Sequence, residues 1–545
     1  MARLVPDATH FVSSSACELP GGCTRAAVIG GIAHVLWRYD VLRTLFTGTE
    51  QDLRQVVQGS GRMAVPVYRA SGGEAGEIAG QIASELAGRP FENDREWPAR
   101  FAIVEDGDVP AYVVMATDRL AFDGHGVAAV EEDMVKACLG DADTSLPQWQ
   151  PLDEAAYEQS PEGQAQNERA LGYWRTTLQQ APGSLFDFPV FPAGPMRYCH
   201  LQVKSAGMTH AMRMLRRSSR LSASSLIISA AAVVLGQYSG HQEIVMRMVA
   251  GNRLGRARKN MVATLTSEGV FLLNLAGLPF SQIARNAFRA SGSANQFAFC
   301  DPAAVETAWA DLRLRRGAYL DLGICFSDVQ GGFADPRAEP PEVDDLDEAE
   351  LRKLAELTTV TDSYTPAGIL GMRMFLVAWD RGDIMLQLSC DTQYVPAEAG
   401  RELLLGIERL LMAAACRDLT AAEFSQVTGV KPVSRGEDWM RFGSDWVDVA
   451  AAGRLWRKVV GAGQSAVVWD QAPDGERRLV GYVAGEQPPG FTALHRAFVA
   501  ALGERSDVRA PDCYRHVARP PADPDRPASW LEALVLAEHS GRADS

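Results

Sequence analysis

The longest apolar stretch of the sequence, LIISAAAVVL at residues 226–235, constrains the fold more than any other feature. It has about half of the ~20 residues that a helix needs to span a bilayer, so we expect no membrane-spanning helix. The helical pattern around it covers Ser222–Tyr238, and a strand-like run, Glu243–Val249, follows directly. A buried helix that leads into a strand predicts an α/β fold with a large core.

The first half of the chain also alternates helix and strand patterns. Residues 24–46 have helical apolar spacing and end in a strand-like step, and Tyr112–Met115 is a short β-rich run. A polar loop at residues 118–126 follows this run and precedes the helical pattern of Val127–Cys138. The loop is therefore predicted at the end of a strand, beside the start of a helix.

The second half repeats this arrangement. A strand-like run, Cys199–Val203, precedes a helix that starts near Thr209. The weak pattern of residues 139–170 predicts a crossover that leads to a helix containing Tyr173. Residues 333–350 are acidic and contain prolines, which favours a surface insertion. Two similar α/β halves are expected.

A different pattern follows the loss of periodicity at residues 418–445. It contains a helix, Trp446–Val460, and two strands, Ser465–Asp470 and Arg478–Val483, which are joined by a turn at residues 472–476. We expect a small α+β domain at this end of the chain.

The composition argues against several classes of function. A net charge of −15 argues against general nucleic-acid binding, because phosphate contacts require a basic surface. The nine cysteines show no CxxC spacing, so neither a disulfide scaffold nor a metal site is expected. No charged-then-apolar leader opens the sequence, and we expect a cytoplasmic protein.

The polar loop contains the residues that could carry chemistry, and we call residues 118–124 the signature loop. Its letters are DRLAFDG, so it holds Asp118, Arg119, Asp123 and Gly124, and His125 follows. An arginine remains protonated and cannot act as a general base, but it can stabilise an oxyanion by about 3 kcal/mol. Alternatively, Arg119 forms an ion pair with Asp118 or with another carboxylate. His125 is either a substitute base or a packing or capping residue.

Several segments in the same order resemble the condensation domains of nonribosomal peptide synthesis. The matching segments are YDVLRTLF at 39–46, RPFE at 89–92, YWR at 173–175, residues 226–253 with YSGHQEIV inside them, EGVFLLN at 268–274 and NQF at 295–297. The family's signature, HHxxxDG, is DRxxxDG in this chain, so the second histidine, which orients or deprotonates the acceptor amine, is replaced by Arg119.

This resemblance implies an α/β (α+β) fold of two chloramphenicol-acetyltransferase-like lobes in a V-shaped pseudo-dimer, with the active site at their junction. The domains expected from it are an N-terminal lobe at 1–170, a C-terminal lobe at 171–425, and a small module at 430–545 that resembles the C-terminal subdomain of adenylation enzymes. The module lacks that subdomain's lysine-bearing segment, which predicts a relict or docking role.

The resemblance also implies roles for individual residues. Asp123 and Gly124 are expected to be structural, and Asp123 is expected to pair with Arg253. Asn274 is a further candidate near the reacting atoms. The chain itself is expected to bind no cofactor, because the substrate arrives on the phosphopantetheine of an acyl or peptidyl carrier protein. The cations expected to receive that carrier are Arg216, Arg217, Arg256 and Arg258.

Three functions follow as hypotheses. The leading one is a free-standing acyltransferase that joins a carrier-bound thioester to an amine or hydroxyl acceptor, mainly by positioning the reactants. The second is an inactive domain that recruits carrier-bound substrate or a tailoring enzyme. The third is heterocyclisation, because Asp118 and Asp123 match that subfamily's DxxxxD spacing, although Gly126, Gly371 and Arg373 depart from its pattern.

Overall fold

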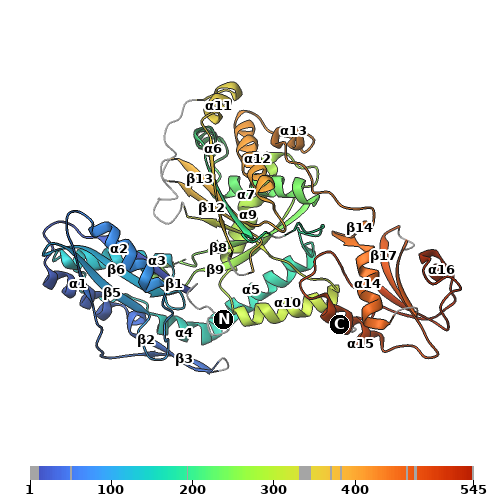
Figure 1. The fold of residues 1–545 in the computed structure, drawn as a ribbon, viewed down its shortest axis with the longest axis horizontal. Coiled ribbons are helices and arrows are strands. Elements are labelled where there is room, and N and C mark those ends of the chain that lie inside the picture. The colour runs from blue at the N-terminus through green and yellow to red at the C-terminus, as the bar shows by residue number, and fades with distance from the viewer. Residues whose placement is uncertain are drawn as a thin grey trace. The chain divides into compact units, whose positions relative to one another are not determined.

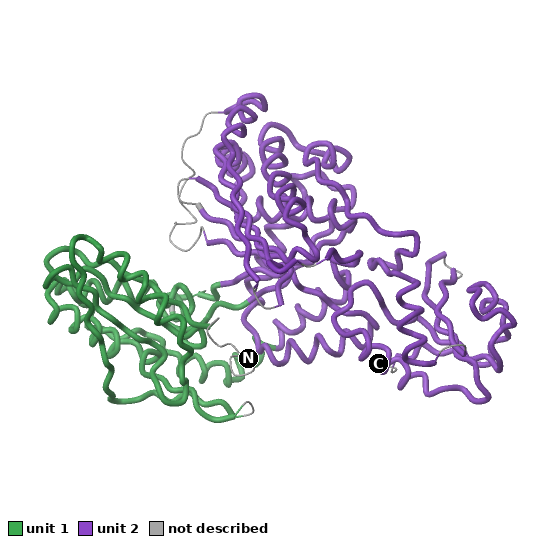
Figure 2. The backbone as a smooth tube through the Cα atoms, in the orientation of Figure 1, with its two compact units in different colours: residues 1–167, 251–267 green, residues 168–250, 268–545 purple. Residues whose placement is uncertain are grey.

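The computed structural model describes residues 11–542 except 50–51, 193, 254, 330–344, 367, 369–370, 381–382, 462–463 and 472–474. The chain forms two compact units, shown in Figure 2. Unit 1 contains Met1–Asn167 together with Gly251–Ser267, and unit 2 contains Glu168–Ala250 together with Glu268–Ser545. The segment Gly251–Ser267 therefore leaves unit 2 between two of its strands and packs with unit 1. We call it the crossover segment.

Unit 1 is a four-stranded sheet with helices on both faces. The strand order is β1-β6-β5-β4, and Val12 of β1 is paired with Asp118 at the end of β6. One core cluster includes residues of α1 and α3, and a second includes residues of α2. The elements of unit 1 are β1 (Val12–Glu18), α1 (Arg25–Arg38), the 3-10 helix η2 (Asp40–Arg43), β2 (Thr44–Thr49), β3 (Asp52–Val57), β4 (Val67–Ala70), α2 (Ala75–Ala87), β5 (Ala99–Asp106), β6 (Val109–Asp118), α3 (Gly124–Cys138), α4 (Pro151–Gln159) and α8 (Gly255–Lys259).

Unit 2 contains a seven-stranded mixed sheet of order β11-β7-β13-β12-β10-β8-β9, labelled in part in Figure 1. Its elements up to residue 428 are α5 (Pro161–Gln180), which enters from unit 1, β7 (Tyr198–Lys204), α6 (Ala206–Ser219), α7 (Ala223–Ser239), β8 (Glu243–Ala250), β9 (Ser267–Asn274), α9 (Phe280–Gln296), α10 (Pro302–Arg316), β10 (Ile324–Asp328), α11 (Glu348–Ala355), β11 (Thr359–Thr365), β12 (Met374–Asp380), β13 (Ile384–Asp391), α12 (Ala397–Cys416) and α13 (Phe424–Thr428).

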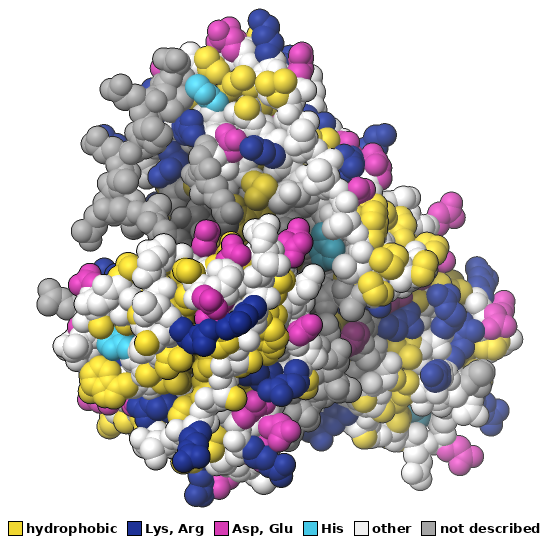
Figure 3. Space-filling view, turned by 60° about the vertical axis from the view of Figure 1, so that its left-hand side comes forward, with side chains coloured by type: hydrophobic (Ala, Val, Ile, Leu, Met, Phe, Trp, Pro, Cys, Tyr) yellow, Lys and Arg dark blue, Asp and Glu magenta, His cyan; other side chains and the backbone are white. Residues whose placement is uncertain are grey.

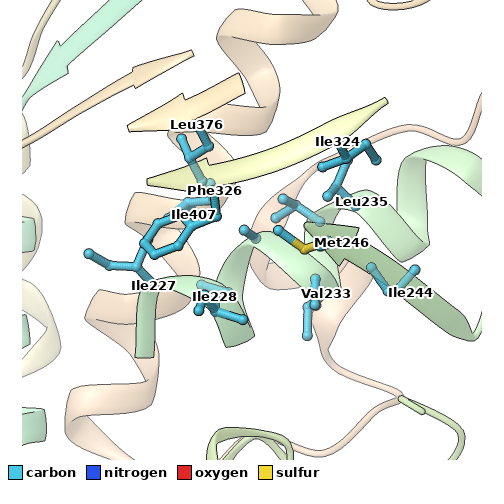
Figure 4. Close-up of a cluster of buried hydrophobic side chains, with 14 of the residues drawn as sticks. Ile227, Ile228, Val233, Leu235, Ile244, Met246, Ile324, Phe326, Leu376 and Ile407 are labelled. Atoms are coloured by element: carbon cyan, nitrogen blue, oxygen red, sulfur yellow. The ribbon is translucent and has the colours of Figure 1, made fainter. Parts of the chain in front are cut away.

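The apolar run at residues 226–235 forms the centre of α7, as the sequence predicts. Every residue of the run is buried in the largest core cluster or, for Ser229, against its own helix. Figure 4 shows Ile227, Ile228 and Leu235 of this helix among side chains of β8, β10, β12 and α12. Of the described helices, none alone is long and apolar enough to cross a membrane, and only the pair α6 and α7, bent by 111°, passes that test together.

Residues 430–542, which we call the C-terminal module, form a separate sheet of order β16-β17-β18-β19 within unit 2. Trp456 and Tyr514 stack in one of its two cores. The elements are β14 (Trp439–Phe442), β15 (Asp445–Asp448), α14 (Val449–Val460), β16 (Ser465–Gln471), β17 (Arg477–Ala484), α15 (Phe491–Leu502), β18 (Cys513–Val517), α16 (Pro527–Leu531) and β19 (Val535–His539).

The α/β class is confirmed, but several boundaries differ from those predicted. The expected crossover at 139–170 contains α4 and the start of α5, whose helical turns are too polar to show apolar periodicity. Trp446 belongs to β15, so the helix expected from it begins at Val449, where Asp448 caps its first turn. The acidic insertion is described only from residue 345, and the turn at 472–476 only from residue 475.

Candidate active site

Asp118 ends β6 and shapes the turn that begins the signature loop. Its Oδ1 accepts the N–H of Leu120 at 2.7 Å, and its carbonyl accepts the N–H groups of Ala121 and Phe122, each at 3.0 Å. The side chain is 4 % exposed, and this burial raises the pKa of the Asp118 carboxyl. Asp118 therefore supports the backbone of the loop rather than facing solvent.

Asp123 is the most extensively bonded residue of the signature loop. It caps α3 by accepting the N–H of Gly126 on Oδ1 at 2.9 Å. Arg253 donates to both carboxylate oxygens, at 2.7 and 2.8 Å. Oδ2 also accepts the N–H groups of Leu265 and Thr266 and the Thr266 hydroxyl, each at 3.0 Å. Burial acts to raise the pKa of Asp123, but Arg253 and the N–H donors outweigh it, and the pKa is lowered.

The crossover segment brings Arg253 to this aspartate. Asn252 adopts a left-handed conformation with φ of 51°. Its amide donates to the Leu265 carbonyl at 2.7 Å and to the Ser267 hydroxyl at 2.6 Å, which ties the two ends of the segment together. Arg253 also donates to the Ala263 carbonyl at 3.3 Å. The segment is thus held in a closed shape from which Arg253 reaches α3.

Arg119 is exposed and is tethered at one side. Its Nε donates to the Ser13 hydroxyl on β1 at 2.9 Å. Its backbone carbonyl accepts the hydroxyl of Thr264 at 2.7 Å, and its N–H donates to the Phe11 carbonyl at 2.8 Å. Among the described residues, no carboxylate lies within ion-pair distance of Arg119, so neither Asp118 nor any other described acid is its partner.

His125 lies in the first turn of α3 and is exposed. Partial desolvation, followed by the positive charge of Arg253, lowers the pKa of His125, although Asp123 opposes the shift. The imidazole is consequently neutral at neutral pH, which is the form that can accept a proton.

The two glycines near Asp123 differ in their surroundings. A Cβ placed on Gly124 would meet nothing within 4 Å, and its φ lies outside the left-handed region, so the backbone here does not require glycine. A Cβ on Gly126 would lie 3.4 Å from Val262 and 3.5 Å from the Ala263 nitrogen, in the crossover segment. A serine at 126, as in the heterocyclisation pattern, would therefore contact that segment.

Asn274 belongs to unit 2, whereas the other candidate catalytic residues belong to unit 1. It ends β9, about 20 Å along the strand from Glu268, the second residue of that strand. Its Oδ1 accepts the N–H of Ala276 at 2.8 Å. The side chain lines a cavity of about 810 Å³ between α5, β9 and α9 that also includes Tyr173 and Arg289.

The cations expected to receive a carrier protein lie in different environments. Arg258 is half-buried and forms an ion pair with the buried Glu154 on α4, with Nε 2.8 Å from Oε2, so it packs the crossover segment against the rest of unit 1. Arg217 in the last turn of α6 is paired with Asp345, and Arg216 beside it is half-buried. The side chain of Arg256 lies outside the described residues.

Arg373 is also an internal residue. Its Nε lies 2.6 Å from Oδ2 of the buried Asp321, and its guanidinium lies 3.9 Å from the centre of the Tyr394 ring. A buried guanidinium held in this way cannot supply the side-chain chemistry that the heterocyclisation pattern places there. Across the described residues, no cluster of His, Cys, Asp or Glu could hold a metal ion.

Comparison with known proteins identifies the family. A family model described as "Condensation domain" matches residues 1–294, which is more than half of the chain. The chain belongs to the condensation-domain family. The isonitrile lipopeptide synthase of Mycobacterium tuberculosis (strain ATCC 25618 / H37Rv) is 24% identical over 280 residues, which are 48% of this chain and 11% of that protein. This condensation-family chain therefore corresponds to a small part of that relative.

Solved structures support the same fold. The condensation domain of the Monacolin K polyketide synthase MokA has a TM-score of 0.58 at 15% identity, covering 77% of this chain and 96% of that domain. The X-domain in its complex with OxyB from teicoplanin biosynthesis has a TM-score of 0.55 at 16% identity, covering 76% of this chain and 90% of that one. Condensation domains are generally acyltransferases, so a condensation-family loop that lacks the second histidine raises a specific mechanistic question.

Proposed function

We propose that this condensation domain transfers an acyl or peptidyl group from a carrier-bound thioester to an amine, and that Arg119 stabilises charge on the reacting carbonyl. The supporting observation is the Asp123 network. The network holds the signature loop at the start of α3, and Arg119 lies exposed at the end of β6 with its Nε bonded to the Ser13 hydroxyl.

The reaction needs no base at position 119. A neutral amine nitrogen attacks the thioester carbonyl, the C–N bond forms, and the oxygen becomes negative. The C–S bond then breaks, the thiolate leaves, and the proton of the amine passes to the thiolate or to solvent. A guanidinium that donates to the oxygen lowers the barrier for both steps, because its charge is opposite to the one that develops.

His125 is the second residue that we assign to this chemistry, as a proton acceptor. It lies two residues after Asp123, in a helix turn whose position is set by the Asp123 cap. If it accepts the amine proton, kcat/KM calculated for the neutral form of the amine remains high as the pH falls to the usual pKa of histidine and declines only below it, because the pKa of His125 is lowered.

The test of this proposal is turnover by the purified chain. Donors are acyl thioesters on a phosphopantetheinylated carrier protein, acceptors are amino acids and simple amines, and mass spectrometry detects the amide. Arg119→Ala is expected to lower kcat by about 100-fold. Arg119→Lys is expected to recover part of the rate, since it keeps the charge but not the planar donor group.

Arg54→Ala is the matched control, because Arg54 is exposed on β3 and is paired only with Asp52 in the described structure. It should leave kcat unchanged. Equal losses in Arg54→Ala and Arg119→Ala would show that the effect comes from general charge rather than from Arg119. A product lighter by one water molecule, formed from a cysteine, serine or threonine acceptor, would indicate heterocyclisation instead.

A recruitment role is the alternative, and the replacement of the basic histidine by Arg119 favours it. The X-domain that shares this fold is solved in complex with OxyB. If no amide forms with any donor and acceptor, while the loaded carrier or a tailoring enzyme binds the chain, recruitment is the function and the transfer proposal is wrong.

A further inference from the structure

The carbonyl end of α10 is completed by residues of the C-terminal module. His495 contacts the Leu314 carbonyl through Nε2 at 2.6 Å, which requires this nitrogen to be the donor. Arg542 donates through Nε to the Arg315 carbonyl at 2.7 Å and through Nη2 to the Arg316 carbonyl at 3.3 Å. The last carbonyls of a helix have no partner within it, and here cationic and neutral donors of the module supply them.

The contact between the lobe and the C-terminal module continues in the residues that follow α10. The Gly317 carbonyl accepts the N–H of Ala510 at 2.6 Å, and Ala318 forms a β-bridge with Arg509. Gly317 has a φ of 67°, and a Cβ on it would lie 2.7 Å from the Ala510 side chain and 3.0 Å from the His495 ring. A glycine is thus needed both for the turn and for the close approach of the module. In Figure 1, α10 ends beside α15.

A buried aspartate joins the module to the lobe at a second place. The Asp187 carboxylate accepts hydrogen bonds from the Arg435 guanidinium at 3.0 Å and from the backbone N–H of Trp446 at 2.8 Å. Nε2 of His241 also lies 2.9 Å from this carboxylate. Arg435 also donates to the Ser239 carbonyl at the end of α7. His241 and Asp187 are each less than 5 % exposed, so removal of Arg435 and Trp446 would leave a buried carboxylate without two of its donors.

The module also contributes an aspartate, Asp445, that bonds to groups of the lobe. Asp445 accepts the N–H of Gly183 at 2.7 Å and lies 3.5 Å from Arg316 and 3.7 Å from Arg509. Polar groups of the lobe therefore depend on the module, and polar groups of the module depend on the lobe. Such reciprocal, buried bonding is costly to separate, because each group would lose a partner.

We propose that the C-terminal module is a permanent cap of the rest of unit 2, so that it neither swings away as a hinged domain nor folds independently of the unit 2 residues that precede it. Its role is to hold the end of α10 and the connection that follows. That connection carries Asp321, the partner of Arg373, and leads into β10. This role does not depend on catalysis, so it stands whether or not the acyl-transfer proposal holds.

The test uses the full chain with a site for a specific protease inserted between Lys431 and Pro432, which leaves Arg435 and all other module contacts on the released fragment. After cleavage, both fragments are expected to co-elute in gel filtration, including in 1 M NaCl at a Debye length of about 3 Å, because buried pairs are weakly screened. A single thermal unfolding transition is also expected. Separate elution of the module, or two transitions, would overturn the proposal.

Arg542→Ala in the cleavable chain is expected to raise the dissociation constant of the two cleaved fragments by about tenfold. Arg441→Ala is its control, because Arg441 donates to the Gly443 carbonyl within the β14–β15 turn. A second measurement needs neither cleavage nor substitution. The Ala510 amide, which is bonded to Gly317, should exchange its hydrogen as slowly as the amides of β17, and rapid exchange would contradict a permanent cap.

Discussion

Two buried aspartates, Asp123 in unit 1 and Asp187 in unit 2, both pair with an arginine but differ in their titration. The pKa of Asp123 is lowered, because Arg253 bridges both of its oxygens and backbone N–H groups add to it, against the effect of burial. Burial dominates at Asp187 and raises its pKa in spite of His241 and Arg435. The pKa of Arg435 is itself lowered by burial.

The difference shows that the presence of an ion pair does not by itself tell whether the pair favours the charged form of the carboxylate. The Asp123 site has enough donors to favour the charged carboxylate relative to water, so it stabilises the signature loop by its charge. The Asp187 site contains the same kind of pair in more buried surroundings. There the ion pair persists because separating its partners would cost more free energy than keeping them together. The first site preserves a loop, and the second joins a lobe to its cap.

The largest expected effect is that of Asp123→Ala. It removes the cap of α3 and leaves the largely buried guanidinium of Arg253 (10% exposed) without its carboxylate, so we expect a loss of about 3–5 kcal/mol in the free energy of unfolding. Urea denaturation followed by circular dichroism measures it. Asp52→Ala, at an exposed ion pair, should cost less than about 0.5 kcal/mol. Equal costs at the two positions would remove Asp123 from its structural role.

The next largest effect is expected for replacement by asparagine, which keeps the shape of the aspartate side chain but removes its charge. Asp123→Asn is expected to cost about 2–3 kcal/mol, because the favoured charge and its pairing with Arg253 are lost. Asp187→Asn is expected to cost roughly half as much, because burial already disfavours the charge that is removed. A larger loss at Asp187 than at Asp123 in the same denaturation experiment would reverse our comparison.

The pH dependence of these two costs sharpens the contrast further. Asp123 contributes stability above its unfolded pKa and loses it as the pH falls through its lowered folded pKa, so the cost of Asp123→Asn shrinks in acid. Asp187 gains protons first in the folded state, so the wild type gains relative stability as the pH falls, and the cost of Asp187→Asn grows. Each slope is expected to stay below the limit of about 1.4 kcal/mol per pH unit for one proton. Denaturation curves at several pH values test it, and slopes of the same sign would contradict the assignment.

The sequence predicts the α/β class and the place of the signature loop at the end of β6, because apolar periodicity and motif order are local properties. It also names Asp123 and Arg253, which the structure places together. The donors from Leu265 and Thr266 are not visible in the sequence, since they depend on the path of the crossover segment. A local signal of that path is Asn252, because asparagine tolerates the left-handed φ of 51° that this position adopts.

The environments of surface cations are less visible in the sequence than the place of the signature loop. Arg258 has the sequence context of an exposed basic cluster, yet it is half-buried and forms an ion pair with Glu154, more than a hundred residues earlier. The attachment of the C-terminal module likewise depends on backbone carbonyls of α10, which carry no sequence signature. Ser13 could have been found only by pairing β1 with β6, because its register, not its type, places it beside Arg119.

Ser13 gives the smallest expected effect and the most direct test of how Arg119 is positioned. Ser13→Ala removes one hydrogen bond to Nε of Arg119, which is worth about 1 kcal/mol, so we expect kcat to fall by roughly fivefold in the acyl-transfer assay. Ser13→Thr keeps the hydroxyl and should restore most of the rate, while KM for the donor stays the same in both variants. Because β1 is an edge strand and Ser13 is only half-buried, the free energy of unfolding should change by less than about 0.5 kcal/mol. A loss of stability without a change in kcat would make Ser13 a structural residue of β1 and leave the Arg119 guanidinium without a positioning partner.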